Sequence, residues 1–256
     1  MLAAPTDDPL SACRVDLTVA DGIAELAAVL ARHGIALFDG VRDARALRSL
    51  AARLGDVAPH RDSDPDGVTV ITDRSEGGRA GRAGFSARAL APHTDCSDRR
   101  RPPLLVVMAC AQPAPSGGDC VLVDGQAVHA DLAATEPDAL AALSGPRGMY
   151  FGDCAGLAGN VFEPQPDGLL GVRLRLDELA QFSPLTQQWK STLRAAVDRH
   201  AITLPLAAGT GYAVNNLRWL HGRAPFIGQR VMWRMLVDPR PEWRIPAGFD
   251  PAGAPR

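Results

Sequence analysis

The sequence contains almost no lysine and has no excess of positive charge. Lys190 is the only lysine among 27 basic residues, and 29 acidic residues leave a formal net charge of −2. Proteins that bind polyanions usually carry a pronounced basic surface, and the short arginine cluster at 99–101 does not provide one. Nucleic acid is therefore not expected as a partner.

Paired cysteines, a signal segment and long apolar runs are also missing. The cysteines are odd in number and include no Cys-x-x-Cys pair, so neither a disulfide framework nor a thiolate zinc site is indicated; they are Cys13, Cys96, Cys110, Cys120 and Cys154. The longest apolar run, 104–111, is far shorter than the ~20 residues that span a bilayer. The first residues are acidic where a secretory signal is basic. We expect a cytoplasmic protein with reduced thiols and no membrane partner.

The composition is that of a packed globular protein, because 46% of the residues are hydrophobic and 22% are charged. At 256 residues the length suits one large domain. We expect a single domain over 1–256, with an irregular C-terminal tail from 246. No repeat of 20 to 50 residues is visible, and no strand runs through a Gly-rich turn into a helix, which argues against solenoids and Rossmann folds.

The apolar spacing predicts helices at the start and a strand-rich body after them. Residues 24–30 have helical spacing that ends at Gly34, and Asp43 is the expected N-cap of a helix that ends at Gly55. Helical spacing returns at 127–143 and 187–200. Short extended segments are expected at 35–38, 68–72, 104–111, 119–125, 202–206, 211–216, 218–222 and 230–237. This pattern predicts a β-rich α+β fold, a sandwich or jelly roll with flanking helices.

One long segment lacks apolar anchors. Residues 74–92 are rich in Gly, Arg and Ser and lie directly before His93. A loop of this length without a core is usually either a functional lid or disordered. Its position favours a lid that closes over a substrate.

Histidines and carboxylates at metal-ligand spacing are the main chemical signal. Two imidazoles and one carboxylate on one face of an ion form the iron site of non-haem oxygenases. The His-x-Asp pattern supplies two such ligands when both residues share one face of a strand. This chain has the pattern three times, beginning at His60, His93 and His129.

The setting of each histidine separates the three candidates. His129 lies in a predicted helix, where residues i and i+2 diverge, and His60 lies in a hydrophilic, turn-rich stretch typical of a solvated loop. His33 and His200 lie near predicted helix ends, where a cation is favourable. His93 with Asp95 precedes an apolar strand, and His221 lies between β-like segments beside Gly222. We select these three as candidate metal ligands.

Two arginines share one face of the last predicted strand. Period-2 alternation over 230–237 puts Arg230 and Arg234 on the same side. One interpretation is that both bind anions, and a dicarboxylate would suit guanidinium groups well. The alternative is that they lie outside and form surface salt bridges.

The chain resembles the taurine dioxygenase and clavaminate synthase-like branch of the 2-oxoglutarate oxygenases. The matching pieces are PHTD at 92–95, GGDCVLVDG at 117–125, and NNLRWLHGRAPF with RVMWR at 215–234. The resemblance implies a double-stranded β-helix with His93, Asp95 and His221 as Fe(II) ligands. It also implies Arg230 at the distal carboxylate of 2-oxoglutarate and Arg234 at an acidic group of the substrate.

One position departs from the family pattern. A threonine usually occupies the position of Cys120, beside the same 2-oxoglutarate carboxylate, and a thiol is a weaker donor than a hydroxyl. Asp95 is present where related halogenases have a small residue, so the resemblance favours hydroxylation, with O₂ consumed and succinate and CO₂ released. Desaturation and cyclisation stay open.

The substrate class is read from a few residues near the motifs. Trp219, Asn216 and Arg234 suggest a small, polar, acid-bearing molecule such as an amino acid, free or attached to a carrier. The alternatives are a cupin-like metalloenzyme that does not use 2-oxoglutarate and a non-catalytic jelly roll that binds a small molecule. The oligomeric state is not predicted.

Overall fold

The computed structural model describes residues 9–75, 81–152 and 156–253. Its α-helices are α1 Gly22–His33, α2 Ala44–Leu54, α3 Gly125–Thr135, α4 Pro137–Ser144 and α5 Lys190–Arg199. Short 3₁₀ turns are η1 Ser11–Cys13, η2 Ala83–Phe85, η3 Pro166–Gly168, η4 Gln187–Trp189 and η5 Pro241–Trp243.

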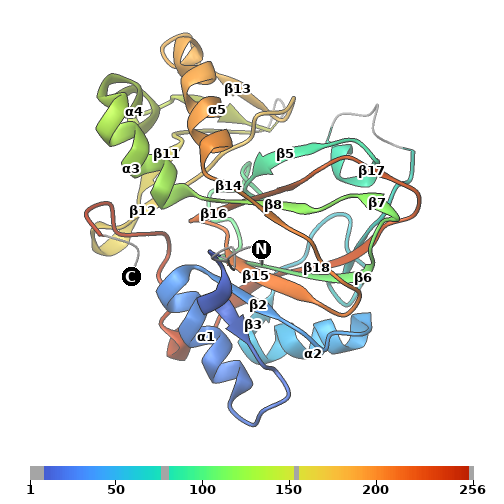
Figure 1. Cartoon of the computed structure of the whole chain (residues 1–256). Helices are drawn as coiled ribbons and strands as arrows, with labels where there is room; N and C mark the ends of the chain where they lie inside the picture. The colour runs from blue at the N-terminus through green and yellow to red at the C-terminus, as the bar shows by residue number, and fades with distance from the viewer. Residues whose placement is uncertain (1–8, 76–80, 153–155, 254–256) are drawn as a thin grey trace, which may run out of the picture.

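Two sheets form the centre of the molecule (Figure 1). The larger sheet has the order β1-β2-β15-β6-β18-β3, and β4 also pairs with β18. Its strands are β1 Arg14–Val15, β2 Ile35–Phe38, β15 Gly211–Asn215, β6 Leu105–Gln112, β18 Val231–Pro239, β3 Gly55–Val57 and β4 Thr69–Ile71. The smaller sheet has the order β14-β8-β16-β5, made of β14 Ala201–Leu204, β8 Cys120–Asp124, β16 Trp219–Arg223 and β5 Leu90–His93.

Short pairings complete the strand content. They are β9 Met149–Phe151 with β10 Leu157–Gly159 and β13 Ala180–Phe182, β11 Phe162–Pro164 with β12 Leu170–Val172, and β7 Ser116–Gly117 with β17 Phe226–Ile227. The predicted mixed, strand-rich α+β class is therefore confirmed.

The first two helices form where local signals predict them. Gly34 ends α1 in the left-handed region at φ 70°, a conformation that glycine adopts without a Cβ clash. Asp43 caps α2, because its carboxylate accepts a hydrogen bond of 2.7 Å from the Ala46 backbone N–H. Both helices cover the outer face of the larger sheet (Figure 1).

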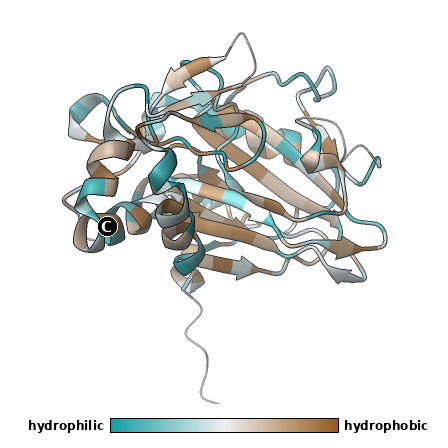
Figure 2. Ribbon diagram, turned by 90° about the horizontal axis from the view of Figure 1, so that it is seen from above, coloured by the Kyte–Doolittle hydropathy of each residue, from teal (hydrophilic) through white to brown (hydrophobic). Residues whose placement is uncertain are grey.

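The hydrophobic residues gather on the sheets and on the inner faces of the helices. Leu47, Leu50 and Leu54 of α2 are buried in the same core cluster as Val107 and Met235 of the larger sheet. Figure 2 shows the apolar segments along the central strands and polar residues along the periphery. A second cluster lies where α3, α4 and α5 pack beside the smaller sheet.

One expectation about the elements is modified by the structure. The helical stretch predicted over 127–143 is two helices, because the chain breaks at Glu136 and α4 restarts with Pro137, which lacks a backbone N–H. Residues 76–80 of the predicted lid lie outside the described residues. The only β-structure within residues 246–253 is an isolated bridge between Phe249 and Leu170.

Within the described ranges, no helix has the length and apolar character to cross a membrane.

Candidate metal centre

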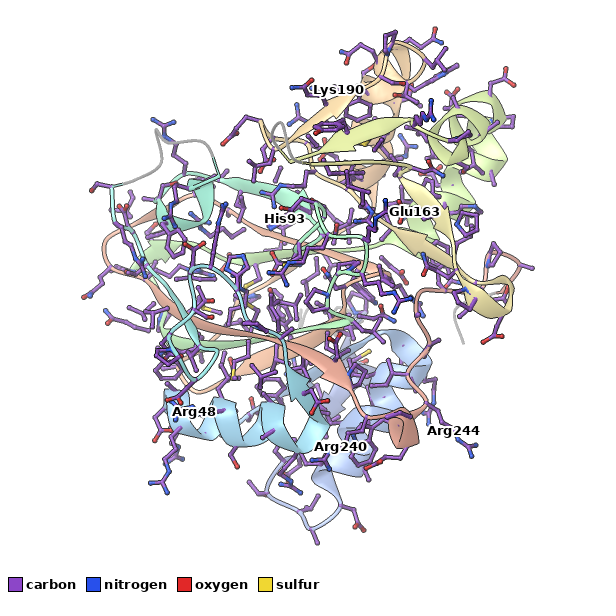
Figure 3. The ribbon with its side chains drawn as sticks, turned by 180° about the vertical axis from the view of Figure 1, so that it is seen from behind. Arg48, His93, Glu163, Lys190, Arg240 and Arg244 are labelled. Carbon is purple, nitrogen blue, oxygen red and sulfur yellow. The ribbon has the colours of Figure 1, made fainter. Side chains whose placement is uncertain are left out.

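The register between two strands of the smaller sheet brings His93 and His221 together. His93 ends β5, His221 is the central residue of β16, and the two are direct partners in this antiparallel pair. Partners across a ladder present their side chains on the same face. Their ring centroids are 4.6 Å apart, and Figure 3 shows His93 in the interior while Arg48 and Arg240 lie at the periphery.

Gly222 allows β5 to lie this close to β16. A Cβ at position 222 would be 2.4 Å from the Leu90 carbonyl oxygen and 2.9 Å from the Pro92 nitrogen. Both contacts are to backbone, which cannot move aside as a flexible side chain can. The glycine is therefore a steric condition for the pairing of the two histidines.

Asp95 reaches the histidines from a turn. β5 ends at His93 and Asp95 lies in the turn that follows, so the expectation that both share one strand face is wrong. The side-chain amide of Asn216 holds the turn instead: its Oδ1 accepts from the Asp95 N–H at 2.8 Å, and its Nδ2 donates to the Asp95 carbonyl at 2.9 Å. The same Nδ2 donates to the Pro103 carbonyl at 3.0 Å. A fully buried amide thus fixes the backbone of the acidic ligand candidate.

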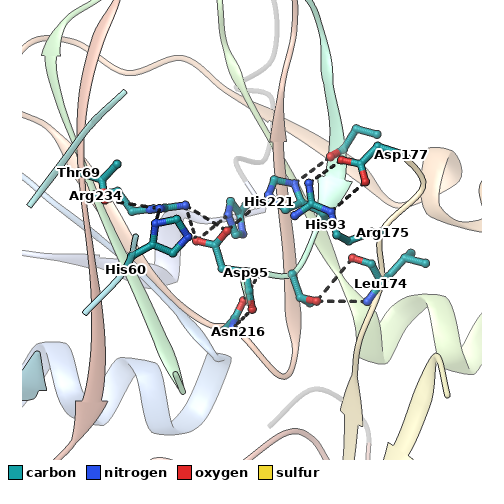
Figure 4. Close-up of polar contacts among 12 residues, drawn as sticks. His60, Thr69, His93, Asp95, Leu174, Arg175, Asp177, Asn216, His221 and Arg234 are labelled. Carbon is teal, nitrogen blue, oxygen red and sulfur yellow. Dashed lines mark hydrogen bonds and ion pairs between the residues drawn. The ribbon is translucent and has the colours of Figure 1, made fainter. Parts of the chain in front are cut away.

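The three side chains form a donor set for a metal ion (Figure 4). One potential ligand atom from each of His93, Asp95 and His221 lies within 4.8 Å of the others, and all three residues are buried. The Asp95 carboxylate is 3.6 Å from His93 Nε2 and 3.8 Å from His221 Nε2. His93 Nδ1–H donates to the Ala91 carbonyl at 3.0 Å, which leaves the Nε2 lone pair for the ion. Two imidazoles and one carboxylate fit Fe(II).

The charge states of these groups suit a cation. Burial by itself would raise the pKa of Asp95, but the Arg234 guanidinium and then the two imidazoles hold it well below its usual range. Burial, reinforced by His93, lowers the pKa of His221 to about 3. The carboxylate is therefore ionised and this imidazole is neutral, which are the forms that bind metal.

Arg234 lies against the carboxylate of Asp95. Its Nη1 donates to the two carboxylate oxygens at 3.2 and 3.0 Å. Its Nη2 lies 3.2 Å from His60 Nδ1 and 3.5 Å from Thr69 Oγ1. The predicted contact of Arg234 with a substrate anion stays a prediction, and any such contact would involve a guanidinium already oriented by Asp95.

His60 is part of the site, so its interpretation as a solvated loop histidine is wrong. Its side chain is 19% exposed, and its Nδ1 accepts from the Asp62 N–H at 3.2 Å as well as from Arg234. A ring nitrogen that accepts carries no proton, so the neutral ring is protonated at Nε2. Turn-rich composition gave no signal for this, because the contact is with a strand far away in the chain.

A cavity of about 310 Å³ adjoins the three ligand candidates and lies between the two sheets. The smaller sheet contributes His93, His221 and Cys120 to its wall, and the larger sheet contributes Met108, Tyr212 and Arg234. Arg230, directly before β18, also lines it. The interpretation of Arg230 and Arg234 as surface residues is therefore excluded.

Arg230 and Cys120 lie together at this cavity. Arg230 Nη2 is 3.6 Å from Cys120 Sγ, and both residues are buried. The guanidinium stem packs against Gly118, where a Cβ would be 2.9 Å from Arg230 Cδ, and the charge lies 5.9 Å from the centre of the Phe226 ring. The structure thus gives Arg230 a defined direction, while its contact with 2-oxoglutarate stays a prediction.

Two residues predicted to bind substrate do not line the cavity. Trp219 packs in the main core, and its Nε1–H donates to the His33 carbonyl at 2.9 Å. Asn216 uses its amide on the backbone of Asp95 and Pro103. Neither side chain has a surface through which it would touch a molecule in the described cavity. Their role is to position the chain around the site.

The cavity wall contains further arginines that the sequence motifs did not indicate, and two of them, Arg175 and Arg223, are buried or nearly so and have defined partners. Arg175 donates through Nε to Asp177 Oδ1 at 2.9 Å and through Nη2 to Oδ2 at 2.5 Å. Arg223 donates to the Ser86 carbonyl and, at 3.3 Å, to the Ala83 carbonyl. Arg223 therefore ties β16 to the described part of the predicted lid. Arg175 lies in the alternating stretch VRLRL at 172–176, which is a signal that could have identified it, whereas Arg223 lies in no alternating segment.

Comparisons with known proteins agree with this geometry. A family model described as "Taurine catabolism dioxygenase TauD, TfdA family" matches residues 6–236. An asparagine oxygenase solved with Fe(II), 2S,3S-3-hydroxyasparagine and succinate has a TM-score of 0.68 at 14% identity, over 84% of this chain and 78% of that one. The oxygenase OrfP, solved with Fe, succinate and (3S)-hydroxy-L-Arg, has a TM-score of 0.67 at 16% identity, over 86% and 81%. PvcB, described as an Fe, alpha-ketoglutarate dependent oxygenase, has a TM-score of 0.64 at 16% identity, over 84% and 79%.

Removing any one of His93, Asp95 and His221 should abolish Fe(II) binding. Each alanine variant loses one of three ligands, and we expect Fe(II) affinity below detection in anaerobic equilibrium dialysis. His129→Ala is the matched control, because His129 belongs to another His-x-Asp pair but packs against Phe162, away from the triad. Retention of iron by His93→Ala, or its loss in His129→Ala, would refute the assignment.

Gly222→Ala should weaken Fe(II) binding although no ligand is changed. The added Cβ pushes β5 away from β16 and separates His93 from His221, and we expect an affinity loss of about 10- to 100-fold, as for changes that misplace metal ligands. Gly84→Ala serves as the control, because a Cβ at Gly84 meets nothing within 4 Å. Equal Fe(II) dissociation constants for the two variants would show that the close approach is unimportant.

Proposed function

We propose, from the premise that this chain belongs to the TauD/TfdA family of dioxygenases, that it hydroxylates an unactivated C–H bond of a small, acid-bearing amino acid or derivative. The chain is an Fe(II)- and 2-oxoglutarate-dependent oxygenase of that family with a His-Asp-His triad. His93, Asp95 and His221 would hold the iron, which when bound would supply the activation of O₂ that is coupled to conversion of 2-oxoglutarate to succinate and CO₂. The observation that carries the proposed substrate class is the set of arginines around the triad in one small cavity.

The arrangement of the two sheets supports a double-stranded β-helix. Along the chain, β5, β8, β14 and β16 belong to the smaller sheet, whereas β6, β15 and β18 belong to the larger one. The chain therefore crosses repeatedly from one sheet to the other. Such alternation is typical of jelly rolls, whose interior accommodates a ligand between the sheets.

The charges on the wall favour an anionic substrate group. Arg234 and Arg175 both line the cavity, and within the part of the chain that the structure describes each has one carboxylate partner, Asp95 and Asp177 respectively. Asp95 would share its charge between Arg234 and a divalent cation held by the triad. The site would then hold an excess of positive charge, which the carboxylates of co-substrate and substrate would balance.

Other features of the wall suit a small molecule with hydrogen-bond acceptors. The volume of about 310 Å³ is at the lower end for ligand pockets. His60, protonated at Nε2, adds a neutral donor whose ring is fixed through Nδ1. The asparagine oxygenase and OrfP, both solved with hydroxylated amino acids, support the amino-acid class for this chain.

Two alternative functions lose support. A cupin-like enzyme without 2-oxoglutarate has no need for the buried Arg230, and a metal-free binding protein has no need for the triad.

This chain's own residues position the metal ligands. Asn216 and Arg234 orient Asp95, and the Ala91 carbonyl orients His93. A cytoplasmic location and a moving lid stay predictions.

An amino-acid screen tests the proposed substrate class. Protein loaded anaerobically with Fe(II) and 2-oxoglutarate is exposed to O₂ with single free amino acids, and succinate is measured. At least one amino acid should raise succinate formation well above the uncoupled rate and gain one oxygen atom by mass spectrometry. Its carboxamide should give a rate about tenfold lower or less, because the anion that the arginines would bind is gone. Equal rates for acid and amide would reject the acid-bearing class.

Arg230→Ala should weaken 2-oxoglutarate binding selectively. Loss of a buried charged partner typically costs about 3–5 kcal/mol, so the concentration of 2-oxoglutarate needed for half-saturation should rise by ~100-fold or more. The readout is titration of the Fe(II)–2-oxoglutarate charge-transfer absorbance without O₂. Arg48→Ala, which removes an exposed arginine outside the cavity, should titrate like the wild type. An unchanged midpoint for Arg230→Ala would place the co-substrate carboxylate elsewhere.

A further inference from the structure

Three groups from three elements meet at the cavity beside Arg230. Cys120 begins β8 in the smaller sheet, Tyr212 lies in β15 of the larger sheet, and Arg230 precedes β18. Tyr212 and Cys120 both line the cavity, and the phenol and the thiol lie close enough for each to shift the pKa of the other. Arg230 Nη2 lies 3.6 Å from the same sulfur. One sulfur atom therefore stands between a phenol and a guanidinium.

Sulfur is a poor partner for two such donors. A thiol is a weak acceptor, whereas a carboxylate offers two oxygens with about four acceptor positions. Tyr212 is 1% exposed and Cys120 is 2% exposed, so water does not compensate for the weak acceptor. Among the described residues, Cys120 Sγ is the acceptor that these donors share, and it is weaker than they require, which indicates that a further acceptor completes the site.

The local charge identifies that acceptor as an anion. Arg223 and Arg230 are both buried, and within the described ranges neither forms an ion pair with a carboxylate. Burial, and then the charge of Arg230, lowers the pKa of Arg223 to about 10, which still leaves it charged at neutral pH. Arg223 is turned to the carbonyls of the lid segment, so Arg230 is the cation that faces Cys120.

We propose that the Tyr212 hydroxyl binds the distal carboxylate of 2-oxoglutarate together with Arg230, in place of the threonine hydroxyl that position 120 lacks. The proposal rests on the use of 2-oxoglutarate by this chain. A carboxylate oxygen replaces Cys120 Sγ as the acceptor for both donors. Cys120 then acts as a small residue that leaves room for the phenol from the facing sheet. A hydroxyl would thus still contact the carboxylate, but it would come from Tyr212 of β15 instead of from position 120 of β8.

The chain offers a matched control for this residue. The sequence has two tyrosines, and Tyr150 of β9 does not line the cavity. Tyr212→Phe and Tyr150→Phe therefore make the same chemical change, the loss of a phenol hydroxyl, at two different positions. We expect Tyr212→Phe to bind 2-oxoglutarate about 10- to 100-fold more weakly in the anaerobic charge-transfer titration, as for the loss of a hydrogen bond to a charged group. Tyr150→Phe should match the wild type.

Two further comparisons separate binding from structure. 2-Oxopentanoate has the same chain as 2-oxoglutarate without the distal carboxylate, and Tyr212→Phe should bind it as the wild type does. Cys120→Thr in the Tyr212→Phe background should recover most of the lost 2-oxoglutarate affinity, because a hydroxyl returns on the other strand. Equal losses for both oxo acids, or no recovery, would mean that the phenol only supports the fold.

A spectroscopic readout needs no variant at Tyr212. Protein labelled with 3-fluorotyrosine and loaded with diamagnetic Zn(II) should show two ¹⁹F resonances, of which Tyr150→Phe removes one. 2-Oxoglutarate should shift the resonance of Tyr212 strongly, and 2-oxopentanoate should shift it much less. If Tyr212→Phe binds 2-oxoglutarate with wild-type affinity, or if 2-oxoglutarate does not shift the Tyr212 resonance, the inference about Tyr212 is overturned. The oxygenase function would still stand in that case, provided that the wild type shows the Fe(II)–2-oxoglutarate charge-transfer band. Absence of that band in the wild type would overturn both.

Discussion

The pairing of His93 with His221 across β5 and β16 is the constraint on which the rest of the site depends. An antiparallel ladder places direct partners on one face, and a shift of one residue would turn one imidazole away from the other. Gly222 allows the close approach, and Asn216 then brings Asp95 to the pair from the adjoining turn. The metal site is thus a consequence of strand register. It also requires the small residue Gly222 between the strands and the buried amide of Asn216 beside Asp95.

Positive charge around a few carboxylates explains the character of the cavity. Arg234 pairs with Asp95, Arg175 pairs with Asp177, and Arg230 faces a thiol. Burying guanidinium groups is costly unless anions accompany them. A protein that binds 2-oxoglutarate and a divalent metal can leave this charge incompletely paired, because its ligands complete the balance. The same arrangement orients the ligands, since each arginine is held by a fixed partner.

A cavity between two sheets can obtain one functional group from either wall. Cys120 and Tyr212 face each other from β8 and β15, so a hydroxyl lost on one strand can be provided from the other without moving the carboxylate it serves. His60 shows the same principle, because it comes from a loop yet contacts Arg234 of β18. Residue identity at one aligned position is therefore a weak guide to what a site of this kind can bind.

The sequence by itself determined the features that depend on short-range physics. Gly34 and Asp43 bound the first helices because a left-handed cap and an N-cap act within a few residues. Arg230 and Arg234 both line the cavity, although Arg230 lies directly before β18 and not in it. Tertiary structure alone decided the contacts between distant segments. Asn216 holds Asp95 across 121 positions and Arg234 contacts His60 across 174, and neither relation leaves a local pattern. The sequence suggests Trp219 and Asn216 as substrate residues, but the fold turns them toward the core and toward the backbone of Asp95, where packing and hydrogen bonding require them.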